Sequence, residues 1–372
     1  MIDRDELGAW LRLLETPLVG RESARKLLAA FGSPQAVIEA STHARRALVG
    51  TNPAAALATC PDDVATRVDA TLAWLAADAA EPRAIVTLGD PHYPRALLAS
   101  ADPPVLLYAQ GRLELLQTDS IAVVGSRNPT PQGHDNARAF SSHLSHAGLT
   151  IVSGMALGVD AAAHAGGLEG AASTIAVVGT GLDRVYPRRN LNLAHRIAAK
   201  GLIVSEYSLG TPPLPANFPL RNRIIAGLTR GTLVVEAALQ SGSLITARLA
   251  VEAGREVFAI PGSIHSPLSR GCHALLKQGA KLVETAQDIL EELQLTGTGA
   301  SAVGATRAAP EQADDADPLL DALGFDPVTL DALVARTGLP ASELNVRLLG
   351  LELEGQVARL PGQLFQRAAA RG

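Results

Sequence analysis

Short apolar runs separated by helix-length segments fill the middle of the chain, from Arg83 to about Leu293, and constrain its fold more than any other feature. The runs are rich in β-branched residues and too short to be helices. They span 121–124, 150–152, 174–178, 202–204, 232–235, 256–260 and 281–283. Continuous apolar strands of this kind are buried on both faces, as in a parallel sheet covered by helices. The pattern predicts an α/β fold: a Rossmann-like, doubly wound, mostly parallel sheet.

Two smaller domains flank this predicted sheet domain, which we place at residues 81–295. Residues 1–80 have helical periodicity and resemble a SAM-like or helix–hairpin–helix unit. Residues 296–317 are rich in Gly, Ala, Thr and Asp without periodicity, which is typical of a linker. Residues 318–372 predict a helix near Leu319, helices at Val328–Arg336 and Ala341–Leu353, and then a β-hairpin, the order of a winged-helix domain.

Composition limits the classes of function. The formal net charge of −5 argues against a wholly basic nucleic-acid protein, although it leaves room for one basic pocket. The sequence has no apolar run long enough for a membrane span, and its N-terminus lacks the features of a signal peptide. Cys60 and Cys272 match no metal or redox spacing, so we expect free thiols in a reducing cytoplasm.

The predicted strands end in loops rich in glycine, hydroxyl and arginine side chains. In an open α/β sheet, ligands bind outside the carboxyl ends of the strands. Glycine lets backbone N–H groups approach a ligand, and arginine supplies positive charge. The set therefore predicts a phosphate-rich ligand. The candidate residues are Gly125, Ser126, Arg127, Gly154, Gly158, Arg188, Asn190, Phe218, Arg221, Asn222, Arg223, Ser241, Gly242, Ser243 and Thr246.

The segment 217–227 predicts a helix at this edge, with Asn217 as its cap and Pro219 near its first position. Arg221 and Arg223 then fall in the first turns, where the helix dipole disfavours positive charge.

Two interpretations of these arginines remain open. An anion at the helix start would attract both guanidiniums, or Arg221 would form a structural ion pair with Glu206 or Glu236. The neighbouring loops favour the anion. If Arg221 is shared with a glutamate, Arg223 becomes the more direct contact.

Known cofactor and catalytic signatures are weak in this chain. No G-x-G-x-x-G follows the first strand and no phosphate-loop motif occurs, so we expect neither NAD nor ATP and no other cofactor. Asp160 and His164 lie four residues apart on a predicted helix, where we expect a capping aspartate and a packed histidine rather than a metal pair. Ser241 and Ser243 have no evident base. We therefore expect a protein that is not an enzyme.

An ordered set of motifs covers about Arg83 to Leu293. These are Gly125-Ser126-Arg127, Ser153-Gly154 with Gly158-Val159-Asp160, Tyr186-Pro187 with Asn190, Ser205-Glu206-Tyr207, Phe218-Pro219-Leu220-Arg221-Asn222-Arg223-Ile224-Ile225, Ser241-Gly242-Ser243-Leu244-Ile245-Thr246 and Pro261-Gly262-Ser263. The combination resembles the DNA-processing protein A (DprA, also called Smf) family. The flanking helical and winged-helix segments are similar to that family's three-part layout.

The resemblance implies a cytosolic, non-enzymatic bacterial protein that binds single-stranded DNA during natural transformation. It implies protection of incoming DNA, displacement of or work alongside single-strand binding protein, loading of the RecA recombinase, and a homodimer formed through the Rossmann-like domain. By residue-wise match, Arg127 and Arg188 contact phosphates and Phe218 stacks on a base. Lysine is common at the position of Arg188, so this chain departs there: it keeps the charge but changes the geometry.

Two other functions are weighed against this one. Phosphoribohydrolases share such a sheet and would use Glu206 or Glu236 as an acid or base, but their Pro-Gly-Gly-x-Gly-Thr loop is missing here and 241–243 stands near its place. A transcription factor would read DNA with the third helix of the winged-helix domain, yet that helix is rich in glutamate. We favour a protein-contact or accessory role for that domain.

Overall fold

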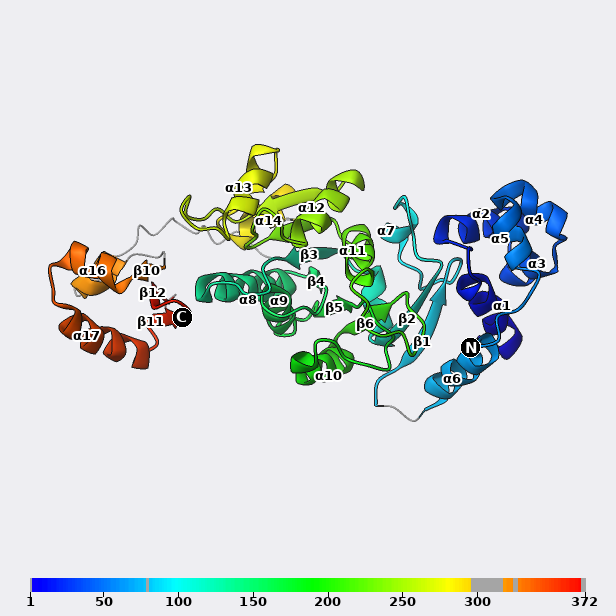
Figure 1. Cartoon of the computed structure of the whole chain (residues 1–372), viewed down its shortest axis with the longest axis horizontal. Coiled ribbons are helices and arrows are strands. Elements are labelled where there is room, and N and C mark those ends of the chain that lie inside the picture. The colour runs from blue at the N-terminus through cyan, green and yellow to red at the C-terminus, as the bar shows by residue number, and fades with distance from the viewer. Residues whose placement is uncertain (1, 78–79, 296–316, 324–326, 369–372) are drawn as a thin grey trace.

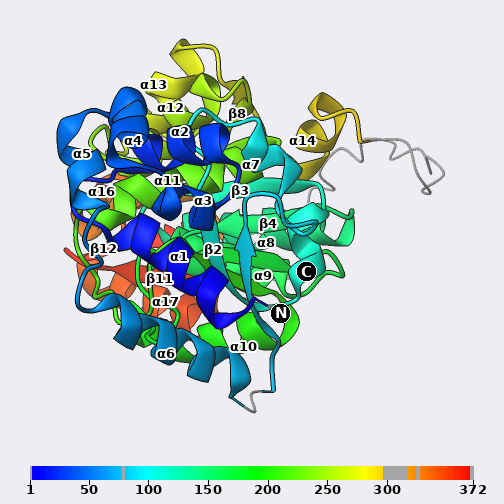
Figure 2. The same cartoon turned by 90° about the vertical axis from the view of Figure 1, so that its right-hand side faces the viewer.

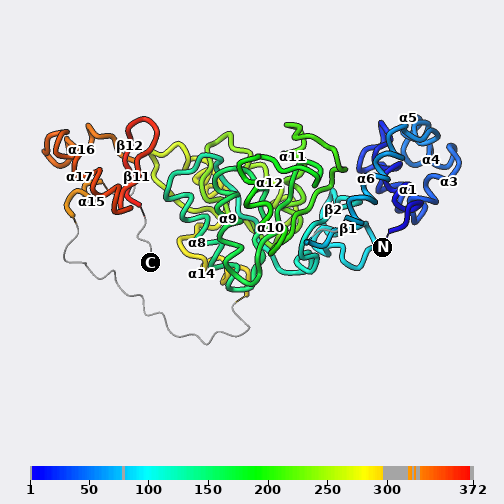
Figure 3. The backbone as a smooth tube through the Cα atoms, turned by 90° about the horizontal axis from the view of Figure 1, so that it is seen from below, coloured from blue at the N-terminus to red at the C-terminus, as the bar shows by residue number. Residues whose placement is uncertain are grey.

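The structure, a computed structural model, describes residues 2–77, 80–295, 317–323 and 327–368. Three bodies follow one another along the long axis of the molecule: a helical N-terminal unit, a central sheet domain and a small C-terminal domain (Figure 1). The tube in Figure 3 shows the same order from below. No helix among the described residues is both long and apolar enough to cross a membrane.

The central domain is built on a nine-stranded sheet in the order β1-β2-β6-β5-β4-β3-β7-β8-β9. Its strands are β1 (Arg83–Thr87), β2 (Leu106–Gly111), β3 (Ser120–Val124), β4 (Thr150–Ser153), β5 (Thr174–Val177), β6 (Leu202–Ser205), β7 (Gly231–Val234), β8 (Glu256–Ala259) and β9 (Lys281–Leu282). Strands β3 to β9 pair in parallel, and they are the seven runs that the sequence predicted. The mostly parallel α/β sheet is therefore confirmed. Strands β1 and β2 are antiparallel additions that the sequence analysis missed.

Helices cover both faces of the sheet. They are α7 (Arg95–Leu98), α8 (Pro131–His146), α9 (Val159–Gly167), α10 (Leu191–Lys200), α11 (Asn217–Leu228), α12 (Ser243–Glu252), α13 (Arg270–Lys277) and α14 (Ala286–Glu292). Alternate residues of a strand enter opposite clusters. Ile121 and Val123 pack under α8, α9 and α14, whereas Ala122 packs under α7 and α11. Each fully buried aliphatic side chain contributes about 2 kcal/mol.

The order of the sheet changes direction at β3. Successive strands β4, β5 and β6 extend to one side of β3, and β7, β8 and β9 extend to the other. Loops that leave β3 and β7 on opposite sides open a crevice at the carboxyl ends of the strands, which is where ligands bind in such sheets. The topology therefore selects one edge of the domain for the site.

The N-terminal unit contains α1 (Arg4–Glu15), α2 (Arg21–Phe31), α3 (Pro34–Glu39), α4 (Thr42–Val49), α5 (Thr51–Ala56) and α6 (Val64–Ala76). It lies against the end of the sheet domain that carries β1 and β2 (Figures 1 and 2). Trp10 and Trp74 share a cluster with Tyr108 of β2. The unit is therefore docked through apolar packing as well as charge.

The C-terminal domain contains α15 (Pro318–Leu323), β10 (Val328–Thr329), α16 (Leu330–Thr337), α17 (Ala341–Leu353), β11 (Val357–Leu360) and β12 (Leu364–Arg367). It is a winged helix with its own hydrophobic core. The helix predicted from Val328 starts two residues later, because Val328–Thr329 pairs with β12 and the Thr329 hydroxyl caps α16 by accepting from the Ala332 amide at 3.2 Å. Most of the predicted linker, 296–316, lies outside the described residues.

Candidate nucleic-acid interface

A groove of about 760 Å³ lies at the point where the sheet order changes direction. Its walls come from the loops after β3, β4, β5, β6 and β7, so segments far apart in the sequence meet there. Several predicted site residues line it together: Gly125, Ser126, Arg127, Phe218, Arg221, Asn222, Ser241, Gly242, Ser243 and Thr246. The remaining predicted residues, Gly154, Gly158, Arg188, Asn190 and Arg223, lie outside this lining.

Glu236 holds the loop after β3 in shape. Its carboxylate accepts hydrogen bonds from the Thr130 amide at 2.9 Å and the Thr130 hydroxyl at 2.6 Å. Its backbone oxygen accepts from the Ser126 amide at 2.7 Å. Burial raises the pKa of Glu236, while the bonds from Thr130 favour its charged form. This glutamate therefore fixes the loop that presents Arg127.

Two glycines allow the loops to approach one another closely. A Cβ atom on Gly125 would lie 2.8 Å from Val159 Cγ2 and 2.9 Å from the backbone oxygen of Glu236. Gly158 has a φ of +78°, and a Cβ there would lie 2.5 Å from the backbone oxygen of Ser126. Any side chain at either position would push the loops apart.

Arg221 places a buried positive charge at the groove. The residue is 5% exposed, and its Nη1 donates to the Val177 backbone oxygen at 3.0 Å. Burial lowers the pKa of Arg221, whereas attraction to the Asp160 carboxylate raises it. The alternative in which Arg221 pairs with Glu206 or Glu236 is therefore wrong, because the carboxylate that acts on this guanidinium belongs to Asp160.

Asp160 and Asn190 brace the loop after β4. Asp160 accepts from the amides of Gly154 and Ala156, both at 3.1 Å. Asn190 is buried and donates through Nδ2 to the oxygens of Met155 at 2.9 Å and Ala156 at 3.1 Å. These contacts give Gly154 and Asn190 structural positions behind the groove.

Arg223 lies on the side of α11 that faces the N-terminal unit. Its Nε donates to Asp102 at 2.7 Å and its Nη2 donates to Glu206 at 2.5 Å. Arg21 of α2 also pairs with Asp102, at 3.0 Å. A more direct contact by Arg223 was predicted only if a glutamate shared Arg221. That condition is not met, and Arg221 is the arginine that lines the groove.

The start of α11 also differs from the prediction. Ala216 occupies the cap position and Asn217 is the first helical residue, so Asn217 is not the cap and Pro219 is two positions further in. The Asn217 side chain instead donates to the Gly179 backbone oxygen at 3.1 Å. This bond ties α11 to the loop after β5.

An aromatic pair flanks the groove. The rings of Tyr186 and Phe218 have centroids 5.5 Å apart and planes inclined by 36°. Tyr186 is 49% exposed and lines the groove with Phe218. Phe218 is half-buried, and rings that are accessible from a groove can stack with nucleobases. The sequence predicted a stacking role for Phe218 alone, although Tyr186 stands in the loop that follows the predicted strand 174–178.

Hydroxyl groups line the wall at the start of α12. The Ser241 and Ser243 hydroxyls lie 2.7 Å apart, and the Ser243 amide donates to Ser241 Oγ at 3.3 Å. Thr246 stands one turn into the helix and also lines the groove. A helix N-terminus with hydroxyl donors favours an anion.

Unpaired positive charge remains at the groove and beside it. Among the residues that the structure describes, Arg127, Arg188 and Arg189 are exposed and pair with no carboxylate. Arg188 follows the aromatic Tyr186 by two residues, in a short 3-10 helix. Charge of one sign gathered at a crevice attracts an anionic ligand.

The catalytic alternatives do not assemble here. His164 Nδ1 donates to Thr174 Oγ1 at 2.7 Å, and burial lowers the pKa of His164 to about 3. Asp160 is engaged with the loop after β4, so the two residues form no pair. Within the described ranges, no group of three His, Cys, Asp or Glu residues could hold a metal ion. The candidate acids Glu206 and Glu236 are held by Arg223 and Thr130.

Sequence reasoning missed part of the groove. Besides Tyr186, the lining includes Pro213, Pro215, Gln240 and Leu268. These side chains carry no charge signal, so only the course of the chain after β6, β7 and β8 could have placed them. Pro213, Pro215 and Leu268 add apolar surface to the groove, and Gln240 adds an amide.

Comparison with known proteins agrees with the geometry. Residues 84–294 match the family model of DNA recombination-mediator protein A, and residues 303–363 match that of the DprA winged helix domain. The chain is 46% identical to protein Smf of Escherichia coli over 73% of this chain and 74% of the relative. It is 50% identical to DNA processing protein DprA of Streptococcus pneumoniae over 55% of this chain and 72% of the relative.

Two solved structures are also similar. The structure of DNA processing protein A from Streptococcus pneumoniae superposes with a TM-score of 0.66 and 39% identity, covering 77% of this chain and 97% of the other. A DNA processing protein A from Helicobacter pylori, studied for its single-stranded DNA binding mode, superposes with a TM-score of 0.52 and 32% identity. The match covers 57% of this chain and 95% of that one.

Proposed function

The chain belongs to the DNA-processing protein A (DprA, also called Smf) family, and on this premise we propose that its groove binds single-stranded DNA in the service of recombination. One observation carries the proposal. The exposed Arg127, the buried Arg221, the hydroxyls of α12 and the rings of Tyr186 and Phe218 converge on one groove. Cations and hydroxyls suit phosphates, and exposed rings suit unpaired bases, which a duplex does not offer.

The residues take different roles in this proposal. Arg127 contacts a phosphate, and the amides and hydroxyls at the start of α12 contact another. Arg188 contacts the backbone as the strand leaves the groove beside Tyr186. Phe218 and Tyr186 stack with bases. Arg221 supplies buried charge and positions the loop after β4 through its attraction to Asp160.

Binding of fluorescent oligo-dT, compared with a duplex of the same length at several salt concentrations, tests the proposal. We expect preference for the single strand and an affinity that falls as salt rises. Arg127→Ala should weaken binding about tenfold and flatten the salt dependence by about one released ion. Arg248→Ala, on the exposed side of α12, is the control and should bind like the wild type. Unchanged binding by Arg127→Ala would contradict the assignment of this groove.

A finer role is our proposal, supported by the family to which the chain belongs. We propose that a cytoplasmic homodimer, formed through the sheet domain, protects incoming strands during natural transformation, works with single-strand binding protein and loads RecA. The test is RecA ATP hydrolysis on oligo-dT coated with single-strand binding protein. Addition of this protein should shorten the lag, and Arg127→Ala should not. If the lag is unchanged although oligo-dT is bound, the mediator role fails while DNA binding stands.

A further inference from the structure

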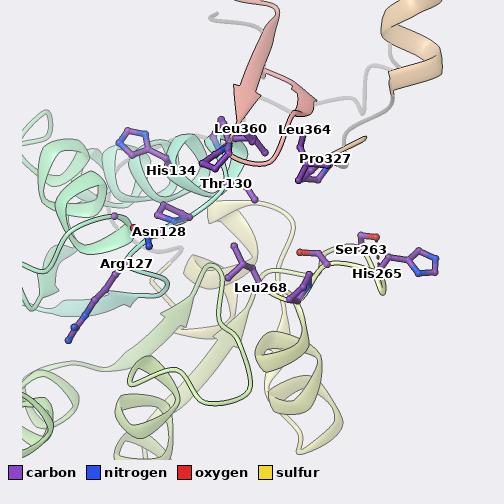
Figure 4. Close-up of a pocket in the computed structure, with 16 residues that line it drawn as sticks. Arg127, Asn128, Thr130, His134, Ser263, His265, Leu268, Pro327, Leu360 and Leu364 are labelled. Carbon is purple, nitrogen blue, oxygen red and sulfur yellow. Dashed lines mark hydrogen bonds between the residues drawn. The ribbon is translucent and has the colours of Figure 1, made fainter. Parts of the chain in front are cut away.

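A second cavity, of about 990 Å³, lies between the sheet domain and the winged-helix domain. One wall is formed by 127–131, the start of α8, and the loop 263–268. The other is formed by Pro327 and by the tip of the β11–β12 hairpin, Leu360, Pro361 and Leu364, as Figure 4 shows. We call this space the interdomain cleft.

The interdomain cleft is continuous with the groove. Arg127, Asn128 and Leu268 line both cavities. In Figure 4 the Arg127 side chain points away from the hairpin tip, while Thr130 lies near Leu360. Because the two cavities share these residues, a strand that occupies the groove can continue past the loop 127–131 into the cleft.

The lining suits nucleobases. Pro129, Pro131, Pro267 and Pro361 supply flat apolar surface, and Asn128 supplies an amide at the rim. Ser263 and Ser266 add hydroxyls that can bond to base edges. Among the described residues that line the cleft, none carries a carboxylate. These residues therefore combine apolar faces with a few polar groups.

The apolar side chains at the hairpin tip do not pack into the core of their own domain. Leu360 and Leu364 face one another in the β11–β12 register, yet neither belongs to the described core of the winged helix. Both are half-exposed and turn toward the cleft. Gln366 donates to Gln132 of α8 at 3.3 Å, which holds the hairpin over the loop that carries Arg127.

Charge distinguishes this hairpin from α17. Helix α17 carries Glu343 and Glu352 and is followed by Glu354, which disfavour a polyanion, and its Arg347 is paired with Glu343 at 2.8 Å.

We propose that the interdomain cleft is a base-binding subsite for single-stranded DNA that leaves the groove, an inference that rests on the proposed function. The wing, rather than the third helix, is then the part of the winged-helix domain that faces DNA.

The test uses the full chain and oligo-dT of two lengths, one that fills the groove only and one long enough to reach the cleft. Leu364→Asp and Pro361→Asp place a carboxylate at the hairpin tip, and Pro361 is exposed, so its variant keeps the fold. We expect both to weaken binding of the long oligonucleotide about tenfold, the effect of losing one stacked base, and to leave the short one unchanged. Leu349→Asp, on the exposed side of α17, is the matched control and should bind both like the wild type.

A 2-aminopurine base moved stepwise along the long oligonucleotide locates the contact. Its fluorescence should change at positions next to the groove in the wild type and not in Pro361→Asp. Equal affinity and equal fluorescence in the wild type and both hairpin variants would overturn the proposed subsite. The cleft would then be either a gap in the packing or a surface covered by protein. If Arg127→Ala also left both oligonucleotides bound like the wild type, the proposed function would fail as well.

Discussion

At the scale of single residues, the shape of the groove depends on side chains that hold its loops in place. Glu236 shapes the loop of Arg127, and Asp160 shapes the loop beside Arg221. Gly154 leaves the space that the Arg221 guanidinium occupies. Such residues are buried or partly buried, so their substitution affects folding and binding together.

Gly154→Ala should destabilise the protein, because the added Cβ would lie 1.6 Å from Arg221 Nη1. Overpacking of this kind costs about 1–3 kcal/mol. Denaturant unfolding measures the loss, and oligo-dT affinity should fall with it. Gly242→Ala is the control: nothing lies within 4 Å of its Cβ and its φ is negative, so stability should hold. Equal losses in the two variants would contradict the account.

His164 should make stability depend on pH. Burial lowers its pKa in the folded protein to about 3, and the ordinary value is 6.5. The unfolded chain therefore binds a proton that the folded chain does not, and stability is lost as pH falls from about 6.5 towards 3, by about 1.4 kcal/mol per unit. The slope of unfolding free energy between pH 6 and 4, compared with that of His164→Gln, measures the effect. The variant should show a shallower slope by about one proton.

At the scale of elements, helix α11 joins two functions through its two arginines. Arg221 faces the groove, and Arg223 faces the N-terminal unit two residues later. The Asp102 carboxylate forms salt bridges with Arg223, Arg21 and Arg25. It therefore connects α11 with α2. A helix that turns about 100° per residue presents such neighbours in nearly opposite directions.

Asp102→Ala should loosen the attachment of the N-terminal unit, because the guanidiniums that Asp102 pairs with lose a carboxylate between them. DNA binding should not weaken. We expect the free energy of unfolding to fall by about 2 kcal/mol and amide hydrogen exchange in α2 to become faster. Exchange in β3 and β7 should change little. Asp69→Ala is the control, since Arg4 and Asp69 form an exposed pair that solvent screens, and its loss should leave stability unchanged. Weakened oligo-dT binding by Asp102→Ala would mean that the network supports the groove.

At the scale of the whole molecule, the two flanking domains are attached differently. The N-terminal unit shares an apolar cluster and an ion-pair network with the sheet domain. The winged helix has a separate core and meets the sheet domain at the hairpin tip. Domains with cores of their own unfold independently when little joins them.

Calorimetry should therefore record two thermal transitions. Deletion of 317–372 should remove the smaller one and leave the larger at the same temperature, because the core of the sheet domain is unchanged. The N-terminal unit should unfold together with the sheet. A shift of the main transition by several degrees on deletion would show that the interdomain cleft carries more stability than its contacts indicate.

Local pattern was sufficient for the parallel strands and the order of the winged-helix elements, since continuous β-branched runs are stable only when buried on both faces. It also located the strand ends that carry Arg127, Phe218 and Ser243. Strands β1 and β2 were not predicted, because β2 joins the sheet by pairing with β6, which lies far along the sequence. Only tertiary structure decided that Arg221 faces the groove and Arg223 the N-terminal unit. Both arginines stand in the same stretch of helix, so the local sequence does not distinguish them. The carboxylates that distinguish them, Asp160 and Asp102, come from distant parts of the chain.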